Sequence, residues 1–109
     1  MPVNAIDYST LTVAGTAVGL DSASPALTFQ KIGGVRVKGA IITVEDADVR
    51  YRTDGTAPTS SEGHLLYVGD VLSFDCWTSG QDWTSEMNKI KFIRTGSTSA
   101  ALKITWYSV

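Results

Sequence analysis

The sequence of 109 residues is poor in cysteine and histidine, two residues that build many catalytic and metal centres. It contains a single cysteine, Cys76, and a single histidine, His64. One cysteine cannot form a disulfide within the chain, which excludes the small secreted scaffolds that disulfides hold together. One histidine and one cysteine also supply too few ligands for the tetrahedral zinc sites that these residues build. We therefore expect no metal and no cofactor.

Long apolar runs and a large excess of one charge are also missing. No apolar run approaches the roughly 18 residues of a membrane-spanning helix, and the N-terminal segment lacks the basic and apolar regions of a secretion signal. Charged residues make up 18% of the chain and the formal net charge is −2, which argues against a protein that coats nucleic acid. We expect neither a membrane nor a nucleic-acid partner, and a chain that is used without export.

Hydroxyl and apolar side chains dominate instead. Serine and threonine together outnumber the charged residues, a balance that suits strands better than exposed helices. Apolar and polar residues alternate with the period of a half-buried strand, and the nearest approach to an amphipathic helix, residues 85–93, is short. The alternating stretches are residues 10–13, 27–30, 35–38, 42–45, 49–53, 72–76, 90–92 and 102–106.

Residues that favour turns separate these stretches. Gly39 lies where the apolar positions change from odd to even numbers, which predicts a bulge or bend. About eight antiparallel strands with uneven connections favour an all-β, two-sheet sandwich of the jelly-roll or Greek-key type. We expect residues 1–7 to form an N-terminal arm and residues 8–109 to form a single sandwich domain. The turn residues are Gly33-Gly34, Asp54-Gly55, Gly69-Asp70, Ser79-Gly80 and Gly96-Ser97.

Two groups of polar residues are candidates for chemistry, and neither matches its motif. Asp46 and Asp48 have the alternate spacing of a calcium loop, but Arg50 interrupts the pattern, so we interpret them as a turn. His64 is a conceivable base for Cys76, Ser60 or Ser61 as nucleophile. No nucleophile-elbow glycine pattern surrounds either serine, and Cys76 shares a face with apolar neighbours and is better explained as a core residue. We therefore expect no enzymatic activity. Two carboxylates brought together only by the fold remain an open alternative.

Aromatic and basic side chains are better candidates for a contact surface. Alternation places Trp77 opposite the buried face of its strand, and Trp83 lies in the polar loop 78–85. Because tryptophan is enriched at interfaces, both indicate a protein contact or a platform for sugar rings, with a cap on the core as the alternative for Trp83. The outward basic residues form a cationic docking face if their strands share a sheet; a solvated face with acidic cross-strand partners is the alternative we favour. These basic residues are Arg36, Lys38, Arg50 and Arg52.

From residue 49 onward, the sequence resembles two known families. The segment 49–59, VRYRTDGTAPT, resembles a strand–turn signature of the small Ig-like domains at the C-terminus of chitobiases, and implies β structure alone. A longer resemblance extends to the C-terminus and includes Gly63-His64-Leu65-Leu66, residues 92–99 (FIRTGSTS) and the terminal Trp106-Tyr107. This half of the chain resembles small virion proteins of tailed bacteriophages. Some of these decorate or cement the capsid, often as trimers with a jelly-roll or related β fold.

The longer resemblance implies a non-enzymatic structural protein on the outer capsid surface, assembled in the host cytoplasm. Its implied partners are the major capsid protein and further copies of itself in a homotrimer, with no small-molecule substrate. The resemblance does not separate a head protein from a tail or fibre component. We expect the arm and the exposed aromatic and basic side chains to make the contacts. These residues are Val3, Ile6, Tyr8, Arg50, Arg52, Trp77 and Trp83.

The alternative function is a carbohydrate-binding or tail- and fibre-associated adhesion module of a phage. In that case Trp77, Trp83 and Tyr107 would stack on sugar rings, while Gln81 and Asp82 would hydrogen-bond to sugar hydroxyls.

Overall fold

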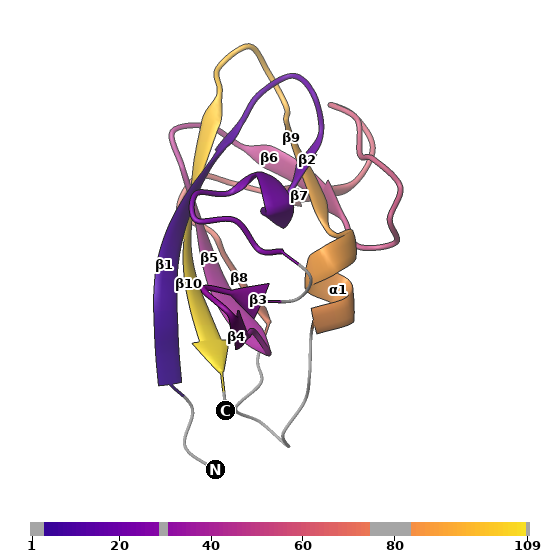
Figure 1. The fold of residues 1–109 in the computed structure, drawn as a ribbon. Helices are drawn as coiled ribbons and strands as arrows, with labels where there is room; N and C mark the ends of the chain where they lie inside the picture. Colours follow the sequence, from indigo (N-terminus) through magenta and orange to yellow (C-terminus); the bar gives the residue numbers. More distant parts are fainter. Residues whose placement is uncertain (1–3, 29–30, 75–83, 109) are drawn as a thin grey trace.

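Two four-stranded antiparallel sheets form the molecule in the computed structural model, which describes residues 4–28, 31–74 and 84–108 (Figure 1). Sheet A contains, in spatial order, β1 (Asn4–Val13), β10 (Ala100–Ser108), β5 (Gly39–Glu45) and β8 (Val71–Phe74). Sheet B contains β2 (Val18–Gly19), β9 (Lys91–Arg94), β6 (Val49–Arg52) and β7 (His64–Leu66). The described residues also include the β3 (Lys31–Ile32) and β4 (Val35–Arg36) hairpin, the 3-10 turn η1 (Leu20–Ser22) and the helix α1 (Thr84–Lys89).

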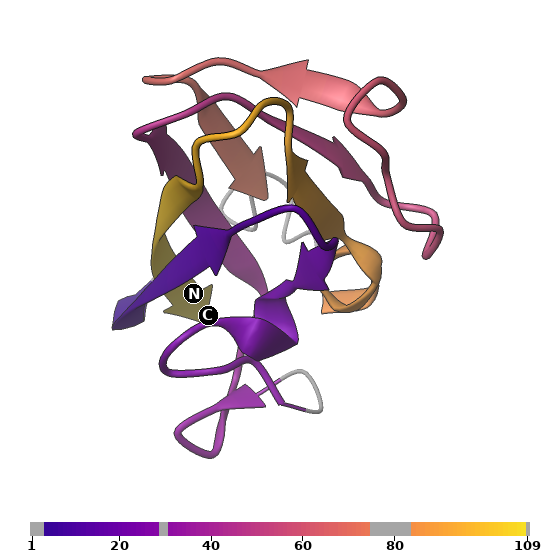
Figure 2. The ribbon, with the colours of Figure 1, turned by 90° about the horizontal axis from the view of Figure 1, so that it is seen from above.

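The strands of the two sheets pair in a nested order. β1 pairs with β10, β2 with β9, β5 with β8 and β6 with β7, always antiparallel. With the β3–β4 hairpin set aside, the first strand thus pairs with the last and the second with the second to last. This nesting is the jelly-roll arrangement. The predicted all-β, two-sheet sandwich is confirmed, and Figure 2 shows the two sheets from the end.

The core lies between the sheets and is filled by the inward positions of the alternation. Trp106 at the end of β10 and Phe92 in β9 are the largest fully buried side chains among the described residues. The alternation therefore predicted the buried face of the strands at 10–13, 42–45, 90–92 and 102–106 correctly. The fully or almost fully buried residues of these strands are Leu11, Val13, Ile42, Val44, Ile90, Phe92, Leu102, Ile104 and Trp106.

β1 begins at Asn4, inside the segment 1–7 that we expected to be an arm. Asn4 pairs with Ser108, and the register shifts between Ala5 and Asp7, where a bulge interrupts the pairing. Uninterrupted alternation along β1 would turn Asp7 into the core. The bulge turns Ile6 toward the core instead and leaves the carboxylate exposed. Residues 4–7 are therefore part of sheet A, because their backbone pairs with β10, whereas residues 1–3 lie outside the described part of the chain.

The stretch 35–38 differs from the prediction of one strand with a single buried face. Val35 is 45% exposed in the β3–β4 hairpin, whereas Val37 is fully buried. Gly33 and Gly34 have positive φ angles of 57° and 81°, which a two-residue hairpin turn of this kind requires. The change of parity predicted at Gly39 is the junction at which the chain leaves this hairpin and enters β5.

A short helix, α1, occupies six residues of a region where we expected no convincing helix. Met87 and Ile90 are buried at the core, and the Ile90 N–H donates to the Glu86 carbonyl over 3.0 Å. Burial of Met87 against the sandwich stabilises a helix too short to form alone. Neither helical segment in the described ranges is long and apolar enough to cross a membrane. The predicted strand 27–30 lies partly outside the described residues, and Thr28 makes only an isolated bridge with Lys31.

Candidate functional site

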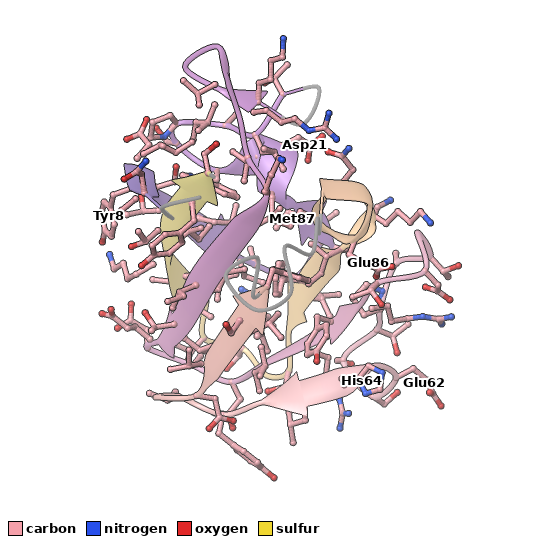
Figure 3. All side chains as sticks on the ribbon, turned by 90° about the horizontal axis from the view of Figure 1, so that it is seen from below. Tyr8, Asp21, Glu62, His64, Glu86 and Met87 are labelled. Carbon is pink, nitrogen blue, oxygen red and sulfur yellow. The ribbon has the colours of Figure 1, made fainter. Side chains whose placement is uncertain are left out.

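The loop of residues 53–63 joins β6 to β7 and borders an open polar hollow of about 460 Å³ at one end of sheet B. Glu62 and His64 lie close together on its rim, as Figure 3 shows. The hollow is lined by Arg52, Thr53, Asp54, Glu62, Gly63 and His64. Its walls carry charges of both signs. Because the 53–63 loop forms part of these walls, the hydrogen bonds that hold the loop also set the shape of the hollow.

Arg50 holds the loop from inside sheet B. Its Nε donates to the Ser60 carbonyl over 3.1 Å, and its Nη1 donates to the Gly63 carbonyl over 2.9 Å. Charge-assisted hydrogen bonds of this kind are stronger than those between neutral groups. The predicted contact residue Arg50 therefore uses two of its donor nitrogens to position its own loop.

Arg52 makes a second local connection, to Asp54. Its Nε and Nη2 donate to the two carboxylate oxygens of Asp54, and the Thr56 N–H donates to Asp54 Oδ1 over 3.2 Å. These hydrogen bonds, that of Arg52 first, hold the pKa of Asp54 below its usual value. The same bond raises the pKa of Arg52. Because both side chains are exposed, solvent screens the pair and its effect on stability is small.

Backbone hydrogen bonds and a glycine close the far end of the loop. The Glu62 N–H donates to Thr59 Oγ1 and the Thr59 N–H donates to the Glu62 carbonyl, each over 2.9 Å. Gly63 has a φ of 131°, and a Cβ there would lie 3.1 Å from the Tyr51 carbonyl and from Pro58 Cβ. Only glycine fits this position without strain. The loop is therefore a preformed structure.

His64 is exposed at the start of β7 and packs against Tyr51. The ring centroids are 5.3 Å apart and the planes are tilted by 39°. The side chain of His64 makes no hydrogen bond within the described residues. No group of three or more His, Cys, Asp or Glu residues in the described ranges could hold a metal ion. Of the conceivable nucleophiles, Cys76 lies outside those ranges, and neither Ser60 nor Ser61 makes a hydrogen bond to the His64 side chain.

The condition for a cationic docking face is not met, because the four basic residues do not share a sheet. Arg36 ends the β4 hairpin strand and Lys38 lies between β4 and β5, whereas Arg50 and Arg52 are in β6 of sheet B. Arg36 lies in the two-stranded hairpin outside both large sheets, whereas the Lys38 N–H donates to the Tyr107 carbonyl of β10 over 2.9 Å.

The other predicted contact residues fall into two groups. Tyr8 is 52% exposed on the edge strand β1 (Figure 3), and Ile6 packs partly against the core. Tyr107, which the carbohydrate alternative names, is half-buried on β10. The remaining residues lie outside the described ranges: Val3, Trp77, Gln81, Asp82 and Trp83.

The acidic residues between β5 and β6 form the turn that we predicted. Asp46 has a positive φ of 74°, a conformation that aspartate tolerates better than most residues. Asp48 accepts a hydrogen bond from the Val68 N–H over 2.9 Å at its Oδ1. This carboxylate therefore connects two turns of the sandwich.

The turn that Asp48 holds carries exposed apolar side chains that sequence reasoning missed. Tyr67 is 58% exposed and Val68 is 52% exposed. The Tyr67 N–H donates to Asp70 Oδ2 over 2.8 Å, and the Gly69 N–H donates to the Val44 carbonyl over 2.8 Å. Gly69-Asp70 signalled the turn, but alternation could not show that the residues just before it are exposed.

Comparison with known proteins gives no identification, because the chain matches no protein-family model, no curated protein and no solved structure. A functional conclusion therefore rests on the geometry described above and on the resemblance in the second half of the sequence.

Proposed function

We propose that this chain is a non-enzymatic virion structural protein that decorates and stabilises the capsid of a tailed bacteriophage. The observation that carries the proposal is the exposed apolar turn at Tyr67 and Val68. Apolar side chains on a rigid, exposed turn are typical of residues that bind another protein. The resemblance of residues 49–109 to small tailed-phage virion proteins supports the same function, as does the jelly-roll fold.

The turn is prepared for binding because its backbone is already fixed. Side-chain carboxylates of Asp48 and Asp70 accept the N–H groups of Val68 and Tyr67, and the Gly69 N–H donates to β5. A segment that is ordered before binding loses little conformational entropy when it docks. Tyr67 and Val68 can therefore present their apolar side chains to the major capsid protein at small cost.

Multivalency gives such a small contact enough strength. A homotrimer on the outer capsid surface would present three copies of the turn and bind neighbouring capsid subunits together. The polar rim of the 53–63 loop, with Glu62 and His64, would add hydrogen bonds at the edge of the contact.

Sedimentation with phage heads tests this function. Purified protein is mixed with heads of the phage that encodes it, and the bound amount is measured after pelleting. We expect saturable binding, weakened about tenfold or more by Val68→Asp, since a buried charge opposes apolar docking. Val35→Asp is the matched control, because Val35 is similarly exposed but lies in the β3–β4 hairpin. Absence of saturable binding by the unaltered protein would contradict the proposal.

A carbohydrate-binding or tail- and fibre-associated adhesion module is the second candidate. The polar hollow beside Asp54, Glu62 and His64 favours it, because carboxylates and a ring face are the groups that recognise sugars. Calorimetric titration with host surface polysaccharide would show saturable heat that His64→Ala removes. The head-binding function predicts no such heat.

A further inference from the structure

The outer face of sheet A is a broad surface that carries few charges. It consists of the even-numbered residues 8–12 of β1, the odd-numbered residues 41–45 of β5 and 101–107 of β10, and residues 71 and 73 of β8. Lys103 and Glu45 are its only charged residues. Threonine, tyrosine and aliphatic side chains occupy most of the other positions. Depletion of charge together with tyrosine is typical of the central part of protein interfaces.

The rows of this face run across all four strands. Thr10, Lys103, Thr43 and Val71 form one row of directly paired residues. The next row is Tyr8, Thr105, Ile41 and Ser73. Each row therefore ends in a strongly exposed residue on an edge strand.

These rows carry exposed apolar side chains on both edges of the sheet. Tyr8 on β1 is 52% exposed and Val71 on β8 is 58% exposed. No other element of the described ranges lies across this face in Figures 1 and 2. Exposed apolar side chains that share one weakly charged face are a feature of contact sites.

We propose that further copies of this chain cover the outer face of sheet A. This inference rests on the self-association included in the proposed function, and it names the surface and the contacts that produce it. A β-sheet face rich in β-branched residues packs well on another sheet. A second copy is the occupant that this surface fits best, because its two charges complement each other.

Lys103 and Glu45 are placed so that they can pair between copies. They occupy adjacent rows on neighbouring strands, and neither side chain has a hydrogen-bond or ion-pair partner in the described part of the chain. In a closed ring of copies, the Lys103 ammonium of each copy can meet the Glu45 carboxylate of its neighbour. A sugar chain would find few carboxylates or amides on this face, and a nucleic acid would find one cation.

The mass of the protein in solution tests the proposal. Sedimentation equilibrium of the full chain over a wide concentration range should show a closed oligomer. Val71→Asp should weaken association about tenfold or more, because the new carboxylate must lose water to enter the contact. Val35→Asp, which adds the same charge to an exposed valine outside this face, should leave association unchanged. Far-ultraviolet circular dichroism confirms that each variant is folded.

Exchanging the two charges tests whether Lys103 of one copy meets Glu45 of another. Lys103→Glu and Glu45→Lys should each weaken association by placing like charges together, and the double variant should recover most of it. A monomeric unaltered protein, equal effects of the two valine variants, or a double variant no better than the singles would overturn the proposal.

Failure of this inference and failure of the proposed function give different results. A monomer that still binds phage heads overturns the contact between copies and leaves the capsid function intact. If the charge variants change association as expected but the oligomer does not bind heads, the contact between copies is supported and the capsid function is contradicted.

Discussion

Side chains on the outer faces of the two sheets follow the same alternation but have different surroundings. On sheet B, Arg50 and Arg52 point outward, yet both are bound to residues of the chain's own 53–63 segment. On sheet A, residues such as Thr105, Ile41 and Val71 carry no long charged group and face no covering element of the described ranges. Alternation shows which side chains point outward. It does not show which of them are still available to a partner.

The largest effect on the free energy of unfolding is expected on the inner side of sheet A, where the hydroxyl of Ser9 bridges two other segments of the chain. Ser9 is fully buried, donates to the Pro25 carbonyl over 2.6 Å, and accepts from Trp106 Nε1 over 2.7 Å. Ser9→Ala leaves the indole N–H of the fully buried Trp106 without a partner and also removes the hydrogen bond to the Pro25 carbonyl. We expect the free energy of unfolding to fall by about 2–4 kcal/mol, measured by urea denaturation.

The matched control for Ser9 is Ser73, which lies on the outer face of the same sheet and is exposed. Ser73→Ala should change the free energy of unfolding by no more than about 0.5 kcal/mol. Equal losses at the two serines would show that the inner and outer sides of sheet A are not distinct.

A smaller loss in the free energy of unfolding is expected where the 53–63 loop meets sheet B. Gly63→Ala combines a positive φ with contacts of 3.1 Å to the Cβ, and we expect it to cost about 2 kcal/mol. Gly55 also has a positive φ, of 88°, but nothing lies within 4 Å of its Cβ position. Gly55→Ala should therefore cost only about 1 kcal/mol. Thermal unfolding of both variants would reveal whether the loop is packed as described.

Arg50→Ala tests whether the arginines of sheet B are committed to the loop. Loss of the hydrogen bonds to the Ser60 and Gly63 carbonyls should cost about 1–2 kcal/mol. The loop should also become sensitive to limited proteolysis, because its backbone is then free to open. Arg52→Ala leaves both of these bonds in place. If it produced the same cleavage, the role assigned to Arg50 would be incorrect.

The smallest effect is the pH dependence of the stability that the Arg52–Asp54 pair contributes to the fold. Because the pKa of Asp54 is lowered in the folded state, its contribution is present above the unfolded pKa, about 4, and is lost as the pH falls through the folded value. The stability difference between the unaltered protein and Asp54→Asn should therefore shrink on acidification. Denaturant midpoints at neutral and acidic pH measure it. A difference that grows in acid would contradict the sign.

Alternation alone predicted the fold class and most of the core. Regular strands such as the one ending in Leu102, Ile104 and Trp106 show a clear period of two over several residues. The bulge that exchanges Ile6 for Asp7 breaks that period, so the first residues of β1 looked like an arm. β7 has only three residues, His64–Leu66, which is too short to show a period.

The candidate site was harder to predict because its contacts join residues to backbone atoms. Arg50 binds carbonyls 10 and 13 residues further along the chain, and any residue type supplies a carbonyl. Sequence reasoning could find Arg50 and Arg52 as outward basic residues. It could not tell that they hold a loop. The Asp-Gly turn after β6 was the only local signal of a partner for Arg52.

The nested pairing of the strands also governs when the molecule can fold during its synthesis. β10 lies between β1 and β5 in sheet A although it is the last strand of the described chain. A growing chain on the ribosome therefore carries β1 and β5 long before the strand that joins them exists. Pairing between such distant segments is slow, and unpaired edges are prone to aggregate meanwhile. Sheet A can accordingly be completed only once β10 has been made, so its assembly depends on the last of its four strands.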